Sequence, residues 1–390
     1  MLRISNYFPL RLLHLSTFAK KILKMNFKFQ NIPYQITRYP KTTDHALFAW
    51  NAADELMLEY ANEHLTKESK ISIHHDRFGI LSTCLHNYHP QIVTLFHSQE
   101  KAIKQNLIQN NISIFDIHTP LDDLAKGIDY SFIKIPKSND LFELYLQQIS
   151  QASHHDSIVI AGFMTKYFSK QALTLAQKYF AEVSQSQAKK KARLLILKSP
   201  KFPKETNIIH DIKLDDQISF KQYYGVFSAK NIDYASQFLM EQMLVREEDK
   251  KILDLGCGNG ILAWKARELS PTAKINLLDD HFLALESAKL NLNTGNNFFH
   301  YGDSLEKFTH NSFDLVISNP PFHFEYENNI DISLSLFSQV YEVLKDKGRF
   351  QLVANRHLNY QTHLRTIFER VDELASNDKF VVYSCEKNLR

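Results

Sequence analysis

The sequence predicts an α/β protein built from two tandem Rossmann-like domains, of which the first is a degenerate copy of the second. Three observations lead to this prediction. The chain has 390 residues, which suits two domains of ordinary size. An apolar strand, a glycine-rich loop and a helix follow one another over 252–269, and this order opens a doubly wound sheet. The stretch 128–137 also parallels 313–322, with Asp129 and Asp314 in equivalent places.

Composition excludes several classes of protein. Hydrophobic residues make up 44% of the chain and charged residues 23%, so the chain is not disordered throughout. No stretch approaches the roughly 18 unbroken apolar residues of a membrane span, and we expect no membrane partner. The three cysteines, Cys84, Cys257 and Cys385, lie far apart, which excludes a disulfide framework and a cysteine zinc site. We therefore expect a cytoplasmic protein that holds no metal.

The chain divides into four segments. Residues 1–25 are either an extension or the result of a mis-assigned start, with Met25 as the true beginning. Residues 26–200 form the degenerate domain, 201–214 the linker and 215–390 the second domain. The pattern after the middle of the second domain predicts a helix, a strand, a helix and a strand in this order: 330–344, 349–355, 361–370 and 379–384.

One stretch of the chain is strongly basic although the net charge is only +3. Residues 163–204 contain a single acid, Glu182, and the following basic residues: Lys166, Lys170, Lys178, Lys189, Lys190, Lys191, Arg193, Lys198, Lys201 and Lys204. Such an excess of positive charge is typical of a surface that binds a polyphosphate chain. A solvated helix face followed by a basic linker would give the same pattern.

The glycine-rich loop carries the most specific signal. Gly256, Gly258 and Gly260 follow Asp254 in the order D-x-G-x-G-x-G, whereas a dinucleotide fingerprint would need glycine at Ile261. This order is similar to the first motif of S-adenosylmethionine-dependent methyltransferases. The physical requirements agree, because S-adenosylmethionine carries no phosphate and its ammonium needs acceptors. Asp254 and the loop carbonyls could supply them.

Two further acids follow predicted strands and complete the expected cofactor site. Asp279 ends the strand-like run 274–279, where a carboxylate can accept hydrogen bonds from both ribose hydroxyls. Asp280 is less suitable by its register. Asp303, within 301–304, lies where this class places the residue that accepts from the adenine amino group.

The expected site of chemistry is Asn319-Pro320-Pro321-Phe322, at the carboxyl end of a buried strand. It resembles the N/D-P-P-Y/F motif of methyltransferases that modify an exocyclic or amide nitrogen. A base amino group is a poor nucleophile, since its lone pair is delocalised. The Asn319 side-chain oxygen and the Pro320 carbonyl can accept its two N–H bonds and aim it. Pro321 adds no competing donor, and Phe322 offers a stacking face. We assign no base role to His323.

The first half repeats this organisation without the chemical residues. The glycine cluster shrinks to Gly79, and we place the lost second-strand acid within 96–98. Lys134 and Lys137 stand where the second half has asparagine and phenylalanine, which suggests contacts to phosphate. These features indicate a copy that kept its fold and lost its cofactor. Two unrelated α/β segments are the alternative.

Together these features resemble the ribosomal RNA guanine-N2 methyltransferases over about residues 26–387. The tandem domains, D-x-G-x-G-N-G and N-P-P-F-H carry the resemblance. Four stretches look like the large-subunit branch of the family: 37–40, 50–55, 353–358 and 377–382. The resemblance implies methyl transfer from S-adenosylmethionine to N2 of a guanosine in 23S rRNA, on naked or early-assembly RNA, by a monomer. It does not give the target nucleotide.

The resemblance also implies a cofactor lid over 224–228, with Phe227 contacting the cofactor. The sequence departs from the family just after this segment. Ala229 stands where arginine is usual, and Asp233-Tyr-Ala235 stands where the family has D-x-G. These departures concern the affinity for the cofactor rather than the reaction.

Three other readings remain open. The small-subunit branch, which acts on 16S rRNA, shares every motif and differs only in the flanking stretches. A protein-glutamine N5-methyltransferase of release factors also has D-x-G-x-G-x-G and N-P-P, but it has a small helical first domain. A non-catalytic RNA-binding assembly factor would require a decayed second site, whereas Asp254, Asp279 and Asn319 are all present.

Overall fold

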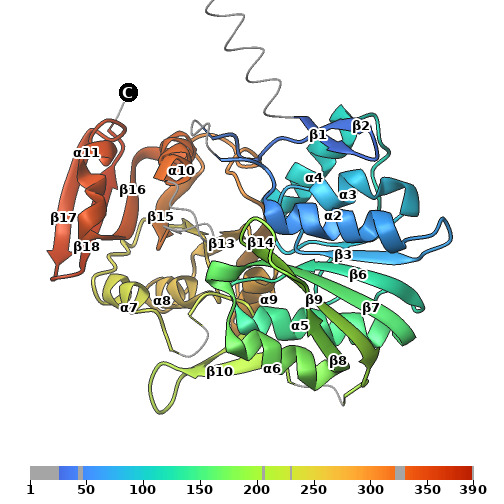
Figure 1. The fold of residues 1–390 in the computed structure, drawn as a ribbon. Coiled ribbons are helices and arrows are strands. Elements are labelled where there is room, and N and C mark those ends of the chain that lie inside the picture. The colour runs from blue at the N-terminus through green and yellow to red at the C-terminus, as the bar shows by residue number, and fades with distance from the viewer. Residues whose placement is uncertain (1–25, 43–46, 204–206, 229–230, 321–329, 389–390) are drawn as a thin grey trace, which may run out of the picture.

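The computed structural model describes most of the chain as two α/β halves (Figure 1). The residues described are 26–42, 47–203, 207–228, 231–320 and 330–388. Within them the strands form two seven-stranded sheets and two two-stranded ribbons. None of the helices in this part of the chain has the length and apolarity that a bilayer crossing requires.

The first half contains a mixed sheet with strand order β5-β4-β3-β6-β7-β9-β8. Its strands are β3 (Ile71–His74), β4 (Gln91–Val93), β5 (Ile117–His118), β6 (Ile128–Lys134), β7 (Ser153–Met164), β8 (Phe180–Gln185) and β9 (Ala192–Pro200). The helices around it are α2 (Ala52–His64), α3 (Ile80–Cys84), α4 (His97–Gln109), α5 (Asn139–Ala152) and α6 (Lys170–Tyr179). The hairpin of β1 (Asn26–Phe29) and β2 (Ile32–Gln35) precedes them. The first five strands in the order are parallel, and β9 runs antiparallel to both of its neighbours, β7 and β8.

The second half has the order β14-β13-β12-β15-β16-β18-β17. Its strands are β12 (Lys251–Leu255), β13 (Lys274–Asp279), β14 (Asn297–Tyr301), β15 (Phe313–Ser318), β16 (Leu344–Asn355), β17 (Arg370–Ser376) and β18 (Phe380–Glu386). Its helices are α7 (Tyr234–Glu241), α8 (Ile261–Leu269), α9 (Phe282–Asn291), α10 (Ile330–Val343) and α11 (Tyr360–Leu364). The two sheets agree strand for strand in order and direction. The predicted α/β fold with two tandem Rossmann-like domains is therefore confirmed, and the shared strand order favours a duplication over two unrelated α/β segments.

The pairing registers identify equivalent residues in the two halves. Asp254 of β12 pairs with Ile317, and the equivalent pair in the first sheet is Ile73 and Phe132. The first copy thus has an isoleucine in place of the acid that opens the glycine loop. This replacement removes the acceptor expected for the ammonium of the cofactor.

One glycine of the loop is kept in both halves for a packing reason. Gly79 and Gly260 each precede a helix in the left-handed region, with φ of 82° and 85°. A Cβ on Gly79 would lie 2.8 Å from the Cα of Ile103 in α4, and one on Gly260 would lie 2.9 Å from Leu292, at the end of α9. Because the neighbouring helix approaches so closely, only glycine fits there. The close approach of the neighbouring helix therefore accounts for the glycine in both halves.

The position of the lost second-strand acid differs from the sequence prediction. His74 pairs with Val93, and Leu255 pairs with Leu278, so Thr94 is equivalent to Asp279. The predicted location within 96–98 was wrong. The apolar run continues past the end of β4 because its last residues pack between the two halves, and sequence alone does not separate these two kinds of burial.

The two halves meet through equivalent loops with local twofold symmetry. Each loop follows the second strand of its sheet and donates one backbone hydrogen bond to the other. The bonds run from Phe282 N to Leu95 O (2.8 Å) and from His97 N to Asp280 O (2.9 Å), with the rings of Phe96 and His281 5.0 Å apart between them. Leu283 and Ala284 of α9 are buried in the core of the first half. The interface therefore involves the same loop that holds the predicted ribose acid.

Several elements differ from their predicted bounds. Part of the expected linker, Ile209–Lys213, forms β10 and pairs with β11 (Ser219–Tyr223). The predicted helix over 361–370 ends at Leu364, and the chain turns into β17 at Arg370. The strands β8 and β17 were not predicted, because each has a mostly exposed face and lacks a strong apolar pattern.

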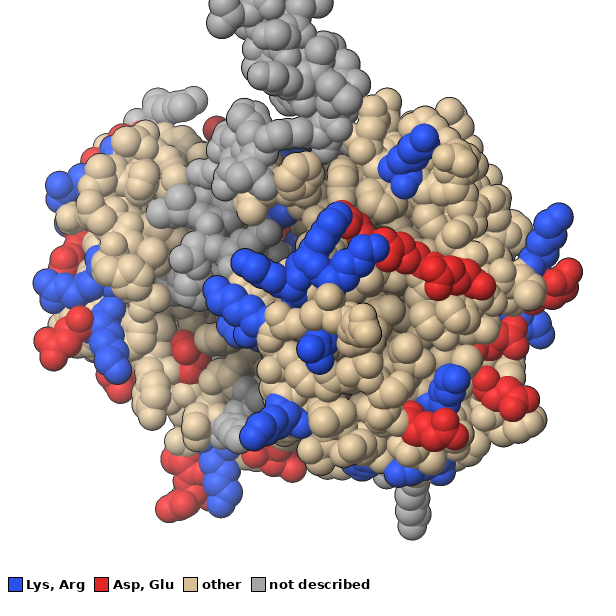
Figure 2. Space-filling model, viewed as in Figure 1, with Lys and Arg blue, Asp and Glu red and all other residues tan. Residues whose placement is uncertain are grey.

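The basic residues of 163–204 divide between the two ends of the first sheet. Lys166 follows β7, Lys170 begins α6 and Lys191 precedes β9, and all three side chains are exposed. Thr165 N donates to Lys191 O (2.9 Å), which holds these segments together. We call Lys166, Lys170 and Lys191 the basic edge. Figure 2 shows lysine and arginine side chains gathered near the centre of the visible face of the molecule, beside a row of acidic residues.

Three other lysines near this edge are paired with acids. Lys189 Nζ lies 2.7 Å from a carboxylate oxygen of Glu59, and Lys190 Nζ lies 2.7 Å from Glu55. Lys134 Nζ donates to the buried Asp54 at 2.8 Å. The phosphate contact predicted for Lys134 is therefore replaced by an internal ion pair, since a buried carboxylate requires a partner.

Candidate active site

The carboxyl ends of four neighbouring strands bring the predicted site residues together. The strand order β14-β13-β12-β15 places Asp303 just after the first of these strands, Asp279 and Asp254 at the ends of the next two, and Asn319 after the last. Leu255 of β12 pairs with Leu278 on one side and Ser318 on the other. In an open parallel sheet this edge is where ligands bind.

Backbone hydrogen bonds hold the glycine loop against the end of β13. Gly256 N donates to Leu278 O (2.8 Å), and Gly258 N donates to Oδ2 of Asp279 (2.8 Å). Gly256 and Gly258 have φ of 71° and 56°, a region that glycine enters without strain. Among the described residues, a Cβ on Gly258 would meet no atom within 4 Å, so this part of the structure leaves the space above the residue open.

Asp254 is fully buried and only partly satisfied. Its Oδ2 accepts from Ala263 N in the first turn of α8 (3.0 Å). Its Oδ1 is buried and has no hydrogen-bond partner among the residues that the structure describes. Burial raises the pKa of this carboxyl to about 8. A buried acceptor without a donor costs free energy, so this oxygen is suited to a ligand that donates a hydrogen bond or carries positive charge.

Asp279 organises the loop around it. Its Oδ2 accepts from Gly258 N, and its Oδ1 accepts from His281 N at 2.8 Å. Burial raises the pKa of Asp279 to about 6, although these backbone hydrogen bonds oppose the shift. Each oxygen of a carboxylate can accept a second hydrogen bond, so the side chain can still receive two hydroxyl groups.

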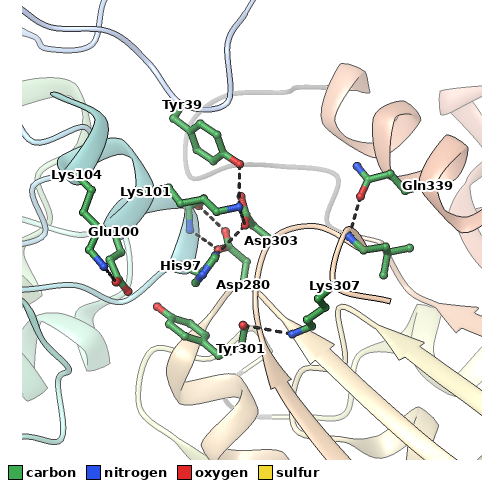
Figure 3. Close-up of polar contacts among 12 residues, drawn as sticks. Tyr39, His97, Glu100, Lys101, Lys104, Asp280, Tyr301, Asp303, Lys307 and Gln339 are labelled. Carbon is green, nitrogen blue, oxygen red and sulfur yellow. Dashed lines mark hydrogen bonds and ion pairs between the residues drawn. The ribbon is translucent and has the colours of Figure 1, made fainter. Parts of the chain in front are cut away.

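Asp303 is the centre of an interdomain cluster (Figure 3). His97 Nδ1 lies 2.8 Å and Lys101 Nζ 2.9 Å from its Oδ1, and the hydroxyl of Tyr39 also donates to the carboxylate. Burial alone would raise the pKa of Asp303, but hydrogen bonds from His97, Lys101 and Tyr39 hold it well below its usual range. The carboxylate therefore stays ionised at neutral pH and is anchored to the first half.

Asp303 and Asp280 both make contacts with the first half of the chain, and these contacts affect which of them can bind the cofactor. The contact between Asp303 and adenine stays a prediction. In this structure the Asp303 carboxylate already accepts hydrogen bonds from residues of the first half. Asp280, which the register made less suitable, accepts from the backbone N (2.7 Å) and hydroxyl (2.6 Å) of Ser98. Both contacts were invisible in the sequence, because the partners lie in the other half of the chain.

Phe227 lies on the predicted lid and is 76% exposed in this structure. Its carbonyl accepts from Gln222 Nε2 (3.1 Å), and the Gln222 oxygen accepts from Asn259 Nδ2 (3.0 Å). The lid segment is thus tied to the glycine loop by residues that the sequence analysis did not identify. Asn259 is the asparagine of D-x-G-x-G-N-G, but its contact with Gln222 could not be predicted from that motif.

Asn319 is held from the side of α7. Its Nδ2 donates to Oδ2 of Asp233 (2.8 Å) and to Oγ of Ser236 (3.0 Å). The side-chain oxygen then remains as the acceptor of the amide. Pro320 follows and is buried. Pro321 and Phe322, which we predicted to complete the site, lie outside the described residues, as does His323.

Comparison with known families identifies the two halves separately. The family model described as "RLMG N-terminal domain" matches residues 24–201, and the one described as "Methyltransferase small domain" matches residues 217–384. These two matches agree with the two sheets. A solved structure of a T. thermophilus 16S rRNA N2 methyltransferase, RsmC, in complex with AdoMet and guanosine covers 93% of this chain and 97% of its own. Its TM-score is 0.74 at 17% sequence identity, which shows that the two proteins share their two-domain fold.

Relatives of higher sequence identity match over nearly the whole chain. Ribosomal RNA large subunit methyltransferase G of Aliivibrio fischeri (strain MJ11) is 33% identical over 367 residues, covering 90% of this chain and 95% of the relative. The protein of the same name from Psychromonas ingrahamii is 31% identical over 373 residues, covering 90% of this chain and 96% of the relative. At this identity and coverage, the chain belongs to the ribosomal RNA large subunit methyltransferase G family.

Proposed function

We propose that this protein transfers a methyl group from S-adenosylmethionine to N2 of a guanosine in 23S rRNA. The relatives named above support the large ribosomal subunit as the source of the substrate. The observation that carries the reaction is the orientation of Asn319, whose amide nitrogen donates to Asp233 and Ser236 and leaves the oxygen to accept. We further propose that the protein works as a monomer in the cytoplasm, on naked or early-assembly RNA.

The residues of the loop fit S-adenosylmethionine in two respects. The buried Oδ1 of Asp254 has no donor within the described part of the chain, and the ammonium of the cofactor can supply positive charge near it. The open space above Gly258 allows a ligand to approach the backbone. Asp279 would accept the ribose hydroxyls from the neighbouring strand end. The cofactor supplies the methyl group on a sulfonium, so the protein needs no group that activates the donor.

The remaining task of the site is to make an aromatic amine nucleophilic and to aim it. The guanine N2 lone pair is delocalised into the ring, and attack on the methyl group develops positive charge on nitrogen. The Asn319 oxygen and the Pro320 carbonyl are acceptors, so they stabilise that charge and hold the nitrogen in line. The methylated ammonium loses its proton readily to water, and the chemistry requires no strong base.

The first half would hold the RNA backbone while the second half performs the reaction. Its glycine loop lacks the acid, since Ile73 stands in the place of Asp254. Asp76 instead accepts from Gly79 N (3.1 Å) and Ser82 N (2.8 Å), which closes the start of α3 on itself. The basic edge of this half provides positive charge for phosphates.

Mass mapping of 16S and 23S rRNA from a deletion strain tests the proposed function directly. Loss of one N2-methylguanosine from 23S rRNA, restored by a plasmid copy, is the expected result. Loss from 16S rRNA would favour the small-subunit branch. An unchanged pattern in both, with defective subunit assembly, would favour a non-catalytic assembly factor.

Substitution of Gly258 by alanine is expected to weaken cofactor binding with little effect on the fold. The left-handed backbone costs about 1 kcal/mol, and the new methyl group meets no atom of the residues that the structure describes. It enters the open space above the loop, so we expect S-adenosylmethionine affinity to fall at least tenfold in isothermal titration calorimetry.

The matched control is Gly79→Ala in the first half. There the methyl group would clash with Ile103, so this variant should melt at a lower temperature while its folded fraction binds S-adenosylmethionine normally. Equal cofactor affinity of Gly258→Ala and wild type would contradict the placement of the cofactor over this loop.

Cofactor affinity is expected to rise as the pH increases from 6 to 8. Burial raises the pKa of Asp279 to about 6 and of Asp254 to about 8, so both carry protons at low pH in the ligand-free protein. A cationic ligand prefers the ionised forms, and binding should therefore release protons. Without ligand, the same two groups make the fold less stable as the pH rises through this range.

Calorimetry in buffers of different ionisation enthalpy measures the released protons. The variant Asp254→Asn keeps an acceptor for Ala263 N and removes the titrating group. Its affinity should be lower and should depend less on pH in this range. A pH profile that is unchanged in this variant would exclude Asp254 as a titrating contact.

A further inference from the structure

We infer that Asp233 and Ser236 are positioning residues that fix the orientation of the Asn319 amide and make this site specific for asparagine over aspartate at that position. This inference rests on the proposed function and adds to it two residues that do not touch the substrate. It concerns the geometry of the free protein, so it can be tested without bound cofactor or RNA.

The contacts use both hydrogens of the amide. Asn319 Nδ2 has two N–H bonds, and the structure provides two acceptors for it, Asp233 Oδ2 at 2.8 Å and Ser236 Oγ at 3.0 Å. With the nitrogen engaged in this way, Oδ1 is the only polar atom of the amide left for a substrate amine. The reversed amide would place its oxygen against the Asp233 carboxylate and present a donor to a donor.

The two acceptors are themselves well fixed. Asp233 is the N-cap of α7, and its Oδ2 also accepts from Ser236 N at 3.0 Å. Ser236 is 7% exposed. On the other side, the hydroxyl of Ser318 donates to Leu255 O at 2.7 Å, which fixes the strand end just before Asn319. A hydrogen bond to an ionised acceptor is stronger than one between neutral groups, so Asp233 is the main determinant of the orientation.

The degenerate half has the same arrangement with a different donor. The registers make Lys134 equivalent to Asn319, and Lys134 donates to Asp54 of α2 at 2.8 Å. In both halves, therefore, an acid at the start of the helix before the sheet holds the residue at the carboxyl end of the fourth strand, although Asp54 is the third residue of α2 and Asp233 is the N-cap of α7. An ammonium group offers no acceptor, whereas an amide held through its nitrogen does. The first half therefore offers no acceptor at this position, although an acid from the preceding helix holds it in both halves.

The charge of Asp233 predicts how substitutions at the two positions combine. The change Asn319→Asp places two carboxylates at hydrogen-bond distance, and we expect kcat to fall at least about 100-fold. The change Asp233→Asn alone keeps an acceptor for the amide and should reduce kcat only a few-fold. In the double variant, the amide of the new asparagine can donate to the new carboxylate. One carboxylate oxygen then faces the substrate, and kcat should recover at least tenfold over Asn319→Asp.

The experiment measures kcat with saturating S-adenosylmethionine and a 23S rRNA fragment for the four proteins of this cycle. The change Ser236→Ala provides a second route, because it removes one acceptor without altering the helix cap, and it should lower kcat but not cofactor affinity. The matched control is Asp215→Asn, since Asp215 caps only the turn between β10 and β11 and should leave kcat unchanged. Melting curves verify that each variant is folded.

A measurement without substrate completes the test. In protein labelled with 15N-asparagine, the side-chain signal that disappears in Asn319→Ala should shift in Asp233→Asn and in Ser236→Ala, but not in Asp215→Asn. An unshifted signal, or equal kcat for Asn319→Asp with and without Asp233→Asn, would overturn the inference. If the wild-type protein methylates no rRNA fragment, the proposed function fails instead, and the amide signal alone still decides whether these residues fix the amide.

Discussion

Replacement of Asn319 by alanine is expected to abolish methyl transfer while leaving the binding of RNA and S-adenosylmethionine nearly unchanged. The side chain contributes one acceptor that acts as charge develops on the amine, and loss of one such contact typically lowers the rate by about 100-fold to 1,000-fold. The ground-state contacts to the RNA backbone and to the glycine loop remain. The variant therefore separates catalysis from binding.

The fold should tolerate this change. Asn319 is partly exposed, and its removal costs two hydrogen bonds, to Asp233 and Ser236. Asp233 keeps its role as cap of α7, so the loss of stability should be about 1–2 kcal/mol.

The measurement compares transfer of a tritiated methyl group to an rRNA fragment with dissociation constants from filter binding and calorimetry. Asn62→Ala, at an exposed position of α2, is the control for removal of an asparagine. If RNA affinity collapses in Asn319→Ala, the side chain anchors the substrate in its ground state, and the aiming role is wrong.

Local patterns in the sequence predicted the elements around the cofactor loop well. The helix after the glycine loop ends at Leu269 as predicted, and the strand over 274–279 has its predicted bounds in the structure. The strand is a short apolar run that is buried over four successive residues, and the helix buries one face through Ile261, Leu262, Ala263 and Ala266. The repeat between the halves was also predicted correctly, since the aspartates in the fourth strand of each sheet are equivalent.

Contacts between distant parts of the chain could not be predicted in this way. Asn319 and Asp233 are 86 positions apart, and Asp303 and His97 are 206 positions apart. No local periodicity reports on such pairs. Asn319 and Asp303 could be identified because each follows the end of a predicted strand. Their partners, Asp233 and His97, could not be identified from the sequence.

Burial at the domain interface produced the main error in the degenerate half. The residues after β4 are apolar because they meet the loop before α9, not because the strand continues. An apolar run in sequence has the same appearance in both situations. The ion pair of Lys134 could not be predicted either, because its acid partner Asp54 lies on α2, 80 positions away in the sequence.

Neutralisation of the basic edge is expected to produce the second large effect, a loss of RNA affinity with a weaker dependence on salt. The triple change Lys166→Gln, Lys170→Gln and Lys191→Gln removes three exposed charges at the carboxyl end of the first sheet. Each phosphate contact on single-stranded RNA contributes about 0.7 to the slope of log affinity against log salt, so the slope should decrease by about 2. Affinity at physiological salt should fall by an order of magnitude or more.

Location, rather than total charge, is the variable that this experiment isolates. Lys189 and Lys190 should contribute less than the basic edge, because a phosphate would first have to displace Glu59 and Glu55 from them. The matched control neutralises three lysines at the opposite end of the same sheet: Lys126, Lys198 and Lys201. Both triple variants change the net charge equally, so a general electrostatic attraction would weaken RNA binding in both to the same degree. A site at the carboxyl end predicts a reduced salt slope only in the first variant, with kcat at saturating RNA preserved because the catalytic strand ends are untouched. Equal slopes of log affinity against log salt in the two variants would show that the basic edge is a solvated surface without a specific role in RNA binding.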